Sequence, residues 1–156
     1  MKKICSILIM LILSGCAGIF DKPICVREKA PVEKISKIEL AGVIHYADGQ
    51  SDLSGNDWTL LSQIAEQVKK SKAKVAVYGH ASHRTRAKDP LQRILINIKV
   101  SNDRAVKVMS GLWAYGVPLA EIKTMAMFDT RPVAEETDRK SEQANRRTEI
   151  YLYWLK

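Results

Sequence analysis

The stretch NIKVSNDRAVKVMSGL, residues 97–112, carries the clearest helical pattern in the chain. Its apolar side chains recur three and four residues apart, the spacing that places them on one face of an α-helix. They are Ala105, Val108, Met109 and Leu112. Gly116 ends the pattern near Tyr115, and Pro118 prevents the helix from resuming. The sequence therefore predicts a helix up to about Tyr115 with one face in a core.

Strand patterns and a second helix surround this stretch. Alternating or β-branched runs predict strands over residues 35–46, 74–79, 122–127 and 148–154, the first with an irregularity at Ala41-Gly42. Between the first two strands, Leu61, Ile64, Ala65 and Val68 mark another helical face, with Ser54, Asn56 or Asp57 as its cap. Residues 80–96 are expected to be a polar loop that turns apolar near Leu91. Residues 131–144 are expected to be mostly loop, with room for a helical turn.

The order of these elements is βαβαββ. Such an order predicts an α/β fold, a two-layer sandwich with a mixed sheet and its helices packed on one face. The folded domain is expected to span residues 35–156. Neither an internal repeat nor a low-complexity stretch interrupts it.

The first residues have the features of a targeting segment. Lys2 and Lys3 precede a short apolar run that ends in small residues, which is the pattern of a secretory signal. Leu13-Ser14-Gly15-Cys16 resembles the bacterial lipobox, which implies cleavage after residue 15 and a lipid on Cys16. Ala17, where Asp would favour inner-membrane retention, implies the periplasmic face of the outer membrane. Residues 16–34, broken by Pro23 and Pro31, are expected to be a tether.

Charge and cysteine content narrow the function classes. The formal net charge of +8 suits an anionic partner, and a secretory signal argues against nucleic acid. Cys5 leaves with the signal and Cys16 takes the lipid, so no disulfide can form within the mature chain. Cys25 in the tether is then either inert or paired with a second chain.

Four motifs in order resemble the OmpA C-terminal domain family, which includes Pal and the periplasmic part of MotB. The resemblance covers about residues 38–153. The motifs are Val43-Ile44-His45-Tyr46-Ala47-Asp48-Gly49 with Leu53; Val75-Ala76-Val77-Tyr78-Gly79-His80; Asn97-x-x-Val100-Ser101-x-x-Arg104-Ala105-x-x-Val108, followed by Gly116-Val117-Pro118; and Asn145-Arg146-Arg147-Thr148-Glu149-Ile150. The resemblance implies a domain that holds the peptide stem of peptidoglycan noncovalently, at its meso-diaminopimelate side chain.

The resemblance also implies which residues bind. Arg104 falls on the arginine that holds the ligand carboxylate, and a guanidinium matches a carboxylate with two parallel hydrogen bonds. Without a ligand, Arg104 would be an ordinary helix arginine or pair with Asp103. The family reads Gly-His-Thr-Asp, whose Asp holds the ligand ammonium, but this chain has Ser82 at that place. The missing charge would cost about 1.5–3 kcal/mol of binding.

The loop after Ser82 offers two interpretations of this departure. Asp89 could swing in as the missing acid, or it could merely start a turn before Pro90. The basic side chains of the loop could bind a stem carboxylate, or they could simply be solvated. These are Arg84, Arg86, Lys88 and Arg93. The Gly-His-Ala-Ser sequence with an Arg-Thr-Arg loop is interpreted as a variant subgroup.

Four further residues complete the candidate site. Tyr46 and Asp48 end the first strand at the edge that lines the family's pocket, although Asp48-Gly49 is also a common turn. Asn97 could orient the long loop, and Ser101 could bind ligand or its own helix. Asn145-Arg146-Arg147 is expected to tie the last loop to the sheet.

Other chemistries find no support in the residues. His80 and His83 have no evident third ligand, so no metal and no cofactor are predicted. No Gly-x-Ser-x-Gly elbow or paired-carboxylate pattern occurs, so no enzyme is expected. The leading expectation is an outer-membrane lipoprotein that anchors to peptidoglycan. The alternative is a structural subunit of an envelope-spanning assembly, such as a secretion system, with weak or lost peptidoglycan binding.

Overall fold

The computed structural model describes residues 34–85 and 87–156. The predicted signal segment, and the predicted tether up to residue 33, lie outside this part. The elements follow the predicted order, with one short helix and a 3-10 turn added. They are β1 (Ile35–His45), α1 (Gly55–Ser71), β2 (Lys74–His80), α2 (Pro90–Ala114), η1 (Leu119–Glu121), β3 (Ile122–Phe128), α3 (Arg139–Asn145) and β4 (Arg147–Leu155).

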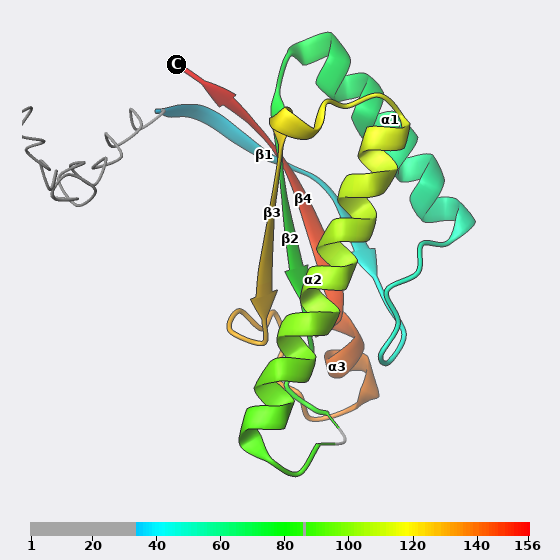
Figure 1. Cartoon of the computed structure of the whole chain (residues 1–156), viewed down its shortest axis with the longest axis vertical. Helices are drawn as coiled ribbons and strands as arrows, with labels where there is room; N and C mark the ends of the chain where they lie inside the picture. Colours follow the sequence, from blue (N-terminus) through cyan, green and yellow to red (C-terminus); the bar gives the residue numbers. More distant parts are fainter. Residues whose placement is uncertain (1–33, 86) are drawn as a thin grey trace, which may run out of the picture. The chain divides into compact units, whose positions relative to one another are not determined.

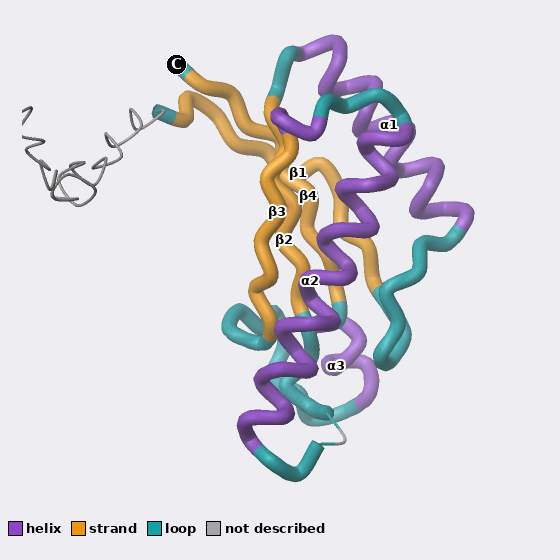
Figure 2. Tube along the Cα trace, viewed as in Figure 1, coloured by secondary structure: helices purple, strands orange, loops and turns teal. Residues whose placement is uncertain are grey.

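The four strands form one mixed sheet in the order β1-β4-β2-β3. β4 is antiparallel to both of its neighbours, and β2 runs parallel to the edge strand β3. The two βαβ crossovers place α1 and α2 on the same face of the sheet, while α3 lies near one end of it (Figures 1 and 2). The predicted α/β sandwich with a mixed sheet is confirmed, and so is the irregularity in β1, where the register shifts between Leu40 and Gly42.

The core lies between the sheet and the two long helices. Alternate residues of the central strands point into it because side chains in a strand alternate between faces. The buried core residues of the strands include Val75, Val77, Ile150 and Leu152, and those of the helices include Leu61, Ile64, Val108 and Leu112. The described residues from Lys34 to Lys156 belong to one compact unit that contains this core. We therefore expect that part of the chain to fold alone.

Gly79 brings β2 and α2 unusually close together. A Cβ atom at this position would lie 1.9 Å from the carbonyl oxygen of Ser101. Only glycine lets the strand approach the helix backbone so closely. The contact fixes the middle of α2 over the end of β2, which is where the candidate site residues of both elements meet.

The start of α2 corrects one prediction. The helix begins at Pro90, not after residue 96: Asp89 is its N-cap, and the Asp89 carboxylate accepts a hydrogen bond from the Gln92 amide at 2.8 Å. Pro90 suits the first helical position because it has no N–H to satisfy. The first turns escaped prediction because their large apolar residues are exposed and mark no core-facing stripe. These are Leu91, Ile94, Leu95, Ile96 and Ile98.

The segment after β3 contains more structure than a single turn. Asp138 and Ser141 form a reciprocal cap that starts α3, a helix of seven residues. Among the described residues, no helix combines the length and apolar composition that crossing a membrane requires.

Candidate functional site

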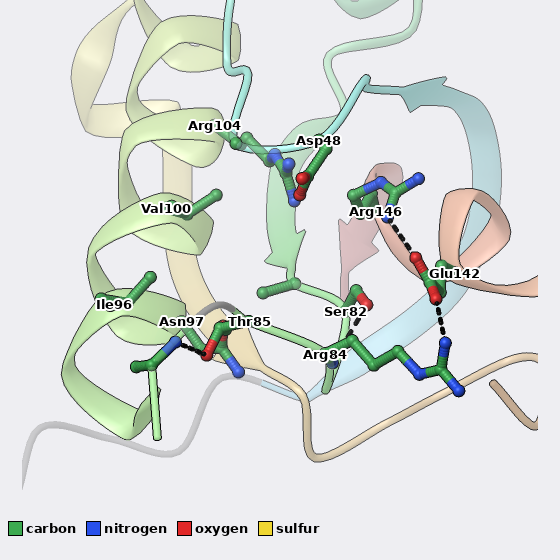
Figure 3. A pocket seen from close by; sticks show the side chains of 13 residues that line it. Asp48, Ser82, Arg84, Thr85, Ile96, Asn97, Val100, Arg104, Glu142 and Arg146 are labelled. Carbon is green, nitrogen blue, oxygen red and sulfur yellow. Dashed lines mark hydrogen bonds and ion pairs between the residues drawn. The ribbon is translucent and has the colours of Figure 1, made fainter. Parts of the chain in front are cut away.

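A cavity of about 540 Å³ opens where the ends of several elements converge. The turn after β1, the loop after β2, the middle of α2 and helix α3 all contribute side chains to its wall (Figure 3). Its charged side chains are Asp48, Arg84, Arg104, Glu142 and Arg146. Three cations therefore face two acids in the wall of this cavity.

Arg104 is almost fully buried, with 1% of its surface exposed, yet it borders the cavity. Its Nε donates to the carbonyl of Gln50 at 2.9 Å, and its Nη1 donates to the carbonyl of His80 at 2.7 Å. The guanidinium lies over the ring of Tyr46, 4.8 Å from the centroid. Two carbonyls and an aromatic face hold the group rigidly, because each attracts a cation.

No carboxylate of the described residues lies within ion-pair distance of Arg104. Burial lowers the pKa of Arg104 to about 10, while nearby Tyr46 and Asp48 favour its charged form. The group is therefore still a cation at neutral pH. A buried cation without an anionic partner is costly, and residues that bind anions commonly carry that cost.

Asn97 presents an unsatisfied hydrogen-bond donor to the same cavity. The side chain is 2% exposed, and its Nδ2 finds no hydrogen-bond partner among the described residues. Buried amide groups nearly always have partners in folded proteins. Asn97 lies on the cavity wall, about two helical turns before Arg104 on the same side of α2. The two side chains together offer an anion a charged and a neutral donor.

Ser82 points its hydroxyl at a carboxylate from a distant loop. Ser82 Oγ donates to Glu136 at 2.8 Å, and the amides of His83 and Arg84 donate to the same carboxylate. Although burial raises the pKa of Glu136, hydrogen bonds from Asn145, the two backbone amides and Ser82 outweigh it and leave the pKa below its ordinary value. The hydrogen bond between Ser82 and Glu136 thus fixes the start of the loop. Position 82 offers no carboxylate to a ligand, unlike the family's Asp.

Glu142 joins two of the arginines across the cavity. Arg84 Nη1 donates to Glu142 at 2.9 Å, and Arg146 Nη1 lies 3.3 Å from the other oxygen of the same carboxylate (Figure 3). Asp48 is different, because it is exposed and forms no ion pair or hydrogen bond with another described residue. Asp48 is therefore the acid in the wall that a ligand cation can reach without displacing a protein contact.

A second buried ionic cluster lies on the sheet beside this site. Arg147, 4% exposed, donates to Glu149 at 2.7 Å and to the carbonyl of Arg131 at 3.2 Å. His80 Nε2 lies 3.6 Å from Glu149. Burial and the charge of Arg147 lower the pKa of His80 to about 4, against the opposing attraction of Glu149. His80 is therefore neutral at pH 7. The charge of Arg147 is paired with Glu149 within the fold, although Arg147 Nη1 and both ring nitrogens of His80 find no hydrogen-bond partner among the described residues.

Comparison with known proteins supports the family. The model of the OmpA family matches residues 45–146, about two thirds of the chain. The chain belongs to the OmpA family. The match includes the strand end at Gly79-His80 and the whole of α2, the helix that carries Arg104.

Solved structures with the same fold include proteins of several envelope systems. The chain is 27% identical to the cell wall anchor of the T6SS from Pseudomonas aeruginosa, with 71% of this chain and 78% of that one covered and a TM-score of 0.59. It is 20% identical to the peptidoglycan-associated lipoprotein from Burkholderia pseudomallei, with 72% and 89% covered and a TM-score of 0.59. The C-terminal domain of Helicobacter pylori MotB is 18% identical, with 70% and 83% covered and a TM-score of 0.60. The comparison with curated proteins gave no match.

The OmpA domain brings some of the predicted site residues together and separates others. Arg104, Asn97, Ser82 and Asp48 line one cavity. Tyr46 lies under Arg104 and supports it, while Ser101 bonds to the carbonyl of Ile98 in its own helix at 3.0 Å. Asp89 does not line the cavity, because its carboxylate caps α2.

Sequence reasoning missed the acids that come from the chain after β3. Glu136 contacts Ser82 although 54 residues separate them, and Glu142 comes from α3. The predicted tie at Asn145 is present: its side chain bonds to Val133, Ala134 and Glu136. The expected tie at Asn145 was the only sequence pattern that pointed to the part of the chain that carries Glu136 and Glu142. The described residues contain no group of three or more potential metal ligands.

Proposed function

We propose that this chain is an outer-membrane lipoprotein whose OmpA domain binds peptidoglycan noncovalently. One observation carries the proposal: Arg104 is a buried cation that borders a cavity and has no carboxylate partner among the described residues. A carboxylate of the peptide stem would supply that partner. The similarity to the cell wall anchor from Pseudomonas aeruginosa supports a wall ligand.

The proposed ligand is the zwitterionic end of a diaminopimelate side chain. Its carboxylate would pair with Arg104 and accept a hydrogen bond from Asn97. Its ammonium would pair with Asp48, which is the unengaged acid of the wall and takes over from the aspartate that Ser82 replaces. Cys16 would carry the lipid, so that the domain grips the wall from the periplasmic face of the outer membrane.

The second candidate is a structural subunit of an envelope-spanning assembly. The observation that favours it is the same relative, which anchors a secretion system. Ser82, whose hydroxyl is committed to Glu136, also fits a domain with weaker wall binding than its relatives. Here the domain would still lie at the wall, and a protein partner would carry the main function.

The test is sedimentation of residues 33–156 with purified diaminopimelate-type sacculi. The Arg104→Met variant removes the charge and keeps much of the volume. Arg139→Met removes an exposed arginine on α3 and serves as the matched control. We expect the parent and Arg139→Met to sediment with sacculi, and Arg104→Met to remain in solution.

The comparison of wall types tests the ligand. Sacculi with lysine in place of diaminopimelate lack the second carboxylate of that side chain, so the parent should bind them more weakly. Equal binding of both wall types would reject the diaminopimelate proposal. If the parent domain binds neither type of sacculus, wall binding is rejected, and the assembly role is the better proposal.

A further inference from the structure

Helix α2 carries a second apolar stripe in addition to the one that faces the core. Its seven members are spaced three or four residues apart, so they lie along one side of the helix. They are Leu91, Leu95, Ile98, Asn102, Val106, Met109 and Trp113. Leu91, Leu95 and Trp113 expose 63%, 57% and 59% of their surface. This outer stripe is therefore apolar except for one asparagine at its centre, and it is exposed except at Met109, which is half-buried and also packs against the core.

The position of the outer stripe on the helix follows from helical geometry. Successive residues turn by about 100°, so Gly111 lies on the side opposite Asn102. Gly111 faces Leu61 and Trp58 of α1. The outer stripe is therefore on the flank of α2 away from α1, and α2 packs over β2 and the edge strand β3. Among the described residues, β3 has a strand on only one side.

The spacing of the outer stripe is symmetric about Asn102. Positions 4, 7 and 11 residues before Asn102 are apolar, and so are the positions 4, 7 and 11 residues after it. Two antiparallel copies related by a two-fold axis at Asn102 would pair Ile98 with Val106, Leu95 with Met109 and Leu91 with Trp113. A two-fold interface requires this kind of self-complementary surface.

Asn102 favours a second copy over other occupants. An apolar surface such as a lipid bilayer would bury its amide without a hydrogen-bond partner, which is unfavourable. At a two-fold axis, the amides of the two copies can bond to each other, and single buried asparagines fix register in paired helices. Lys99 and Asp103, which pair within one chain at 2.6 Å, flank the centre. In the antiparallel pair, Lys99 of each copy would also lie beside Asp103 of the other.

We propose that the domain forms a two-fold dimer through the outer stripe of α2, centred on Asn102. The proposal does not depend on the ligand. Ile96 and Val100, which line the cavity, lie on another side of the helix, so both cavities stay open. If the cavities bind the wall, one dimer presents two of them, and linked sites bind more tightly than single ones.

A cysteine at the axis gives a direct test. Residues 33–156 contain no cysteine, so Asn102→Cys introduces a unique thiol at an exposed position. On the two-fold axis, each thiol meets its own copy within disulfide distance. We expect Asn102→Cys to form a covalent dimer under mild oxidation. Leu91→Cys, at the end of the same stripe, and Gln67→Cys, on exposed α1, should react far more slowly.

A mixing experiment tests the register. Ile98→Cys mixed with Val106→Cys should give the mixed disulfide faster than either variant gives a disulfide with itself. Fast self-crosslinking of Leu91→Cys would indicate parallel helices and overturn the proposed pairing. Crosslinking of Asn102→Cys no faster than that of Gln67→Cys would overturn the interface.

Sedimentation velocity of the cysteine-free domain provides the second readout. The parent should approach dimer mass as its concentration rises, and Asn102→Lys should stay monomeric because it puts two cations at the axis. Gln67→Lys adds the same charge to α1 and should behave as the parent. A parent that is monomeric at every concentration overturns self-pairing, whatever else covers the stripe. A dimer that survives Asn102→Lys uses another surface and also overturns it.

Discussion

Arg104 and Arg147 are two buried arginines in neighbouring parts of the same domain, and they have different partners. Arg147 donates to Glu149 and to a backbone carbonyl. Arg104 donates to two backbone carbonyls, lies on Tyr46, and forms no ion pair with any described carboxylate. Burial alone therefore does not separate the structural arginine from the one that we propose to bind a ligand. The two differ in whether a carboxylate of the fold pairs with the guanidinium.

The comparison matters because both arginines lie in motifs that resemble the same family. In the motif around Arg147, the charge of the arginine is paired with Glu149, which lies two residues further along β4. The motif around Arg104 leaves a positive charge at a cavity. The following predictions test this difference, from the largest expected effect to the smallest.

Arg147→Met should strongly destabilise the domain. The substitution leaves Glu149 partly buried without its ion-pair partner, and breaking a buried pair in this way costs about 3–5 kcal/mol. Urea denaturation followed by circular dichroism measures the loss, with Arg139→Met as the exposed control. A loss of stability no larger than that of the control would show that the ion pair of Arg147 does not stabilise the domain.

Ser82→Asp introduces the aspartate that the family has at this position, but we expect that it will not improve ligand binding. The new carboxylate would lie against Glu136, which now accepts the Ser82 hydroxyl at 2.8 Å. Like charges at this distance disfavour each other, so we expect a loss of about 1–3 kcal/mol in the free energy of unfolding. Adding Glu136→Gln should recover most of it. Tighter sacculus binding by the single Ser82→Asp variant would contradict this account of the loop.

Stability should fall as the pH drops from 7 to 5. The pKa of His80 is lowered to about 4 in the fold, below the ordinary 6.5, so the unfolded chain takes up a proton in this window and the folded chain does not. The expected loss is about 2 kcal/mol, and it should be much smaller in His80→Asn. Urea midpoints across this pH range give the comparison. An equal loss in the variant would assign the pH effect to other groups.

Arg104→Met should have the smallest effect on stability. It removes a buried cation that has no carboxylate partner, and the desolvation cost that is removed with the charge offsets the two lost hydrogen bonds to the carbonyls of Gln50 and His80. We expect the free energy of unfolding to change by less than about 1 kcal/mol in the absence of ligand. A loss as large as that of Arg147→Met would mean that Arg104 is also structural, and the contrast between the two would fail.

Sequence patterns predicted the architecture because the core-facing residues keep a regular period. Leu61, Ile64 and Val68 repeat with the helix, and Ile150 and Leu152 alternate with the strand. The first turns of α2 were missed because their apolar residues do not face the core. The same exposed residues begin the outer stripe, so the failed prediction and the proposed interface have one physical origin.

The candidate site could be predicted only in part. Arg104, Asn97 and Asp48 lie in local motifs with a readable spacing, and all three reach the cavity. Glu136 and Glu142 depend on how the chain after β3 folds back on the loop after β2, which no local period encodes. Asp89 shows the opposite kind of error, a residue considered for the site that the structure places elsewhere. An acid directly before a proline at a helix start serves as the N-cap, and Asp89 caps α2 in this way.

The most direct test of the central claim is the shift in urea midpoint that a soluble diaminopimelate-containing stem peptide produces in residues 33–156 and in Arg104→Met. A ligand that binds only the folded state stabilises it in proportion to the logarithm of its concentration above Kd. We expect the parent midpoint to rise with peptide concentration and the midpoint of Arg104→Met to stay constant. Equal shifts in both proteins would contradict the claim that Arg104 is the unpaired cation that receives the ligand.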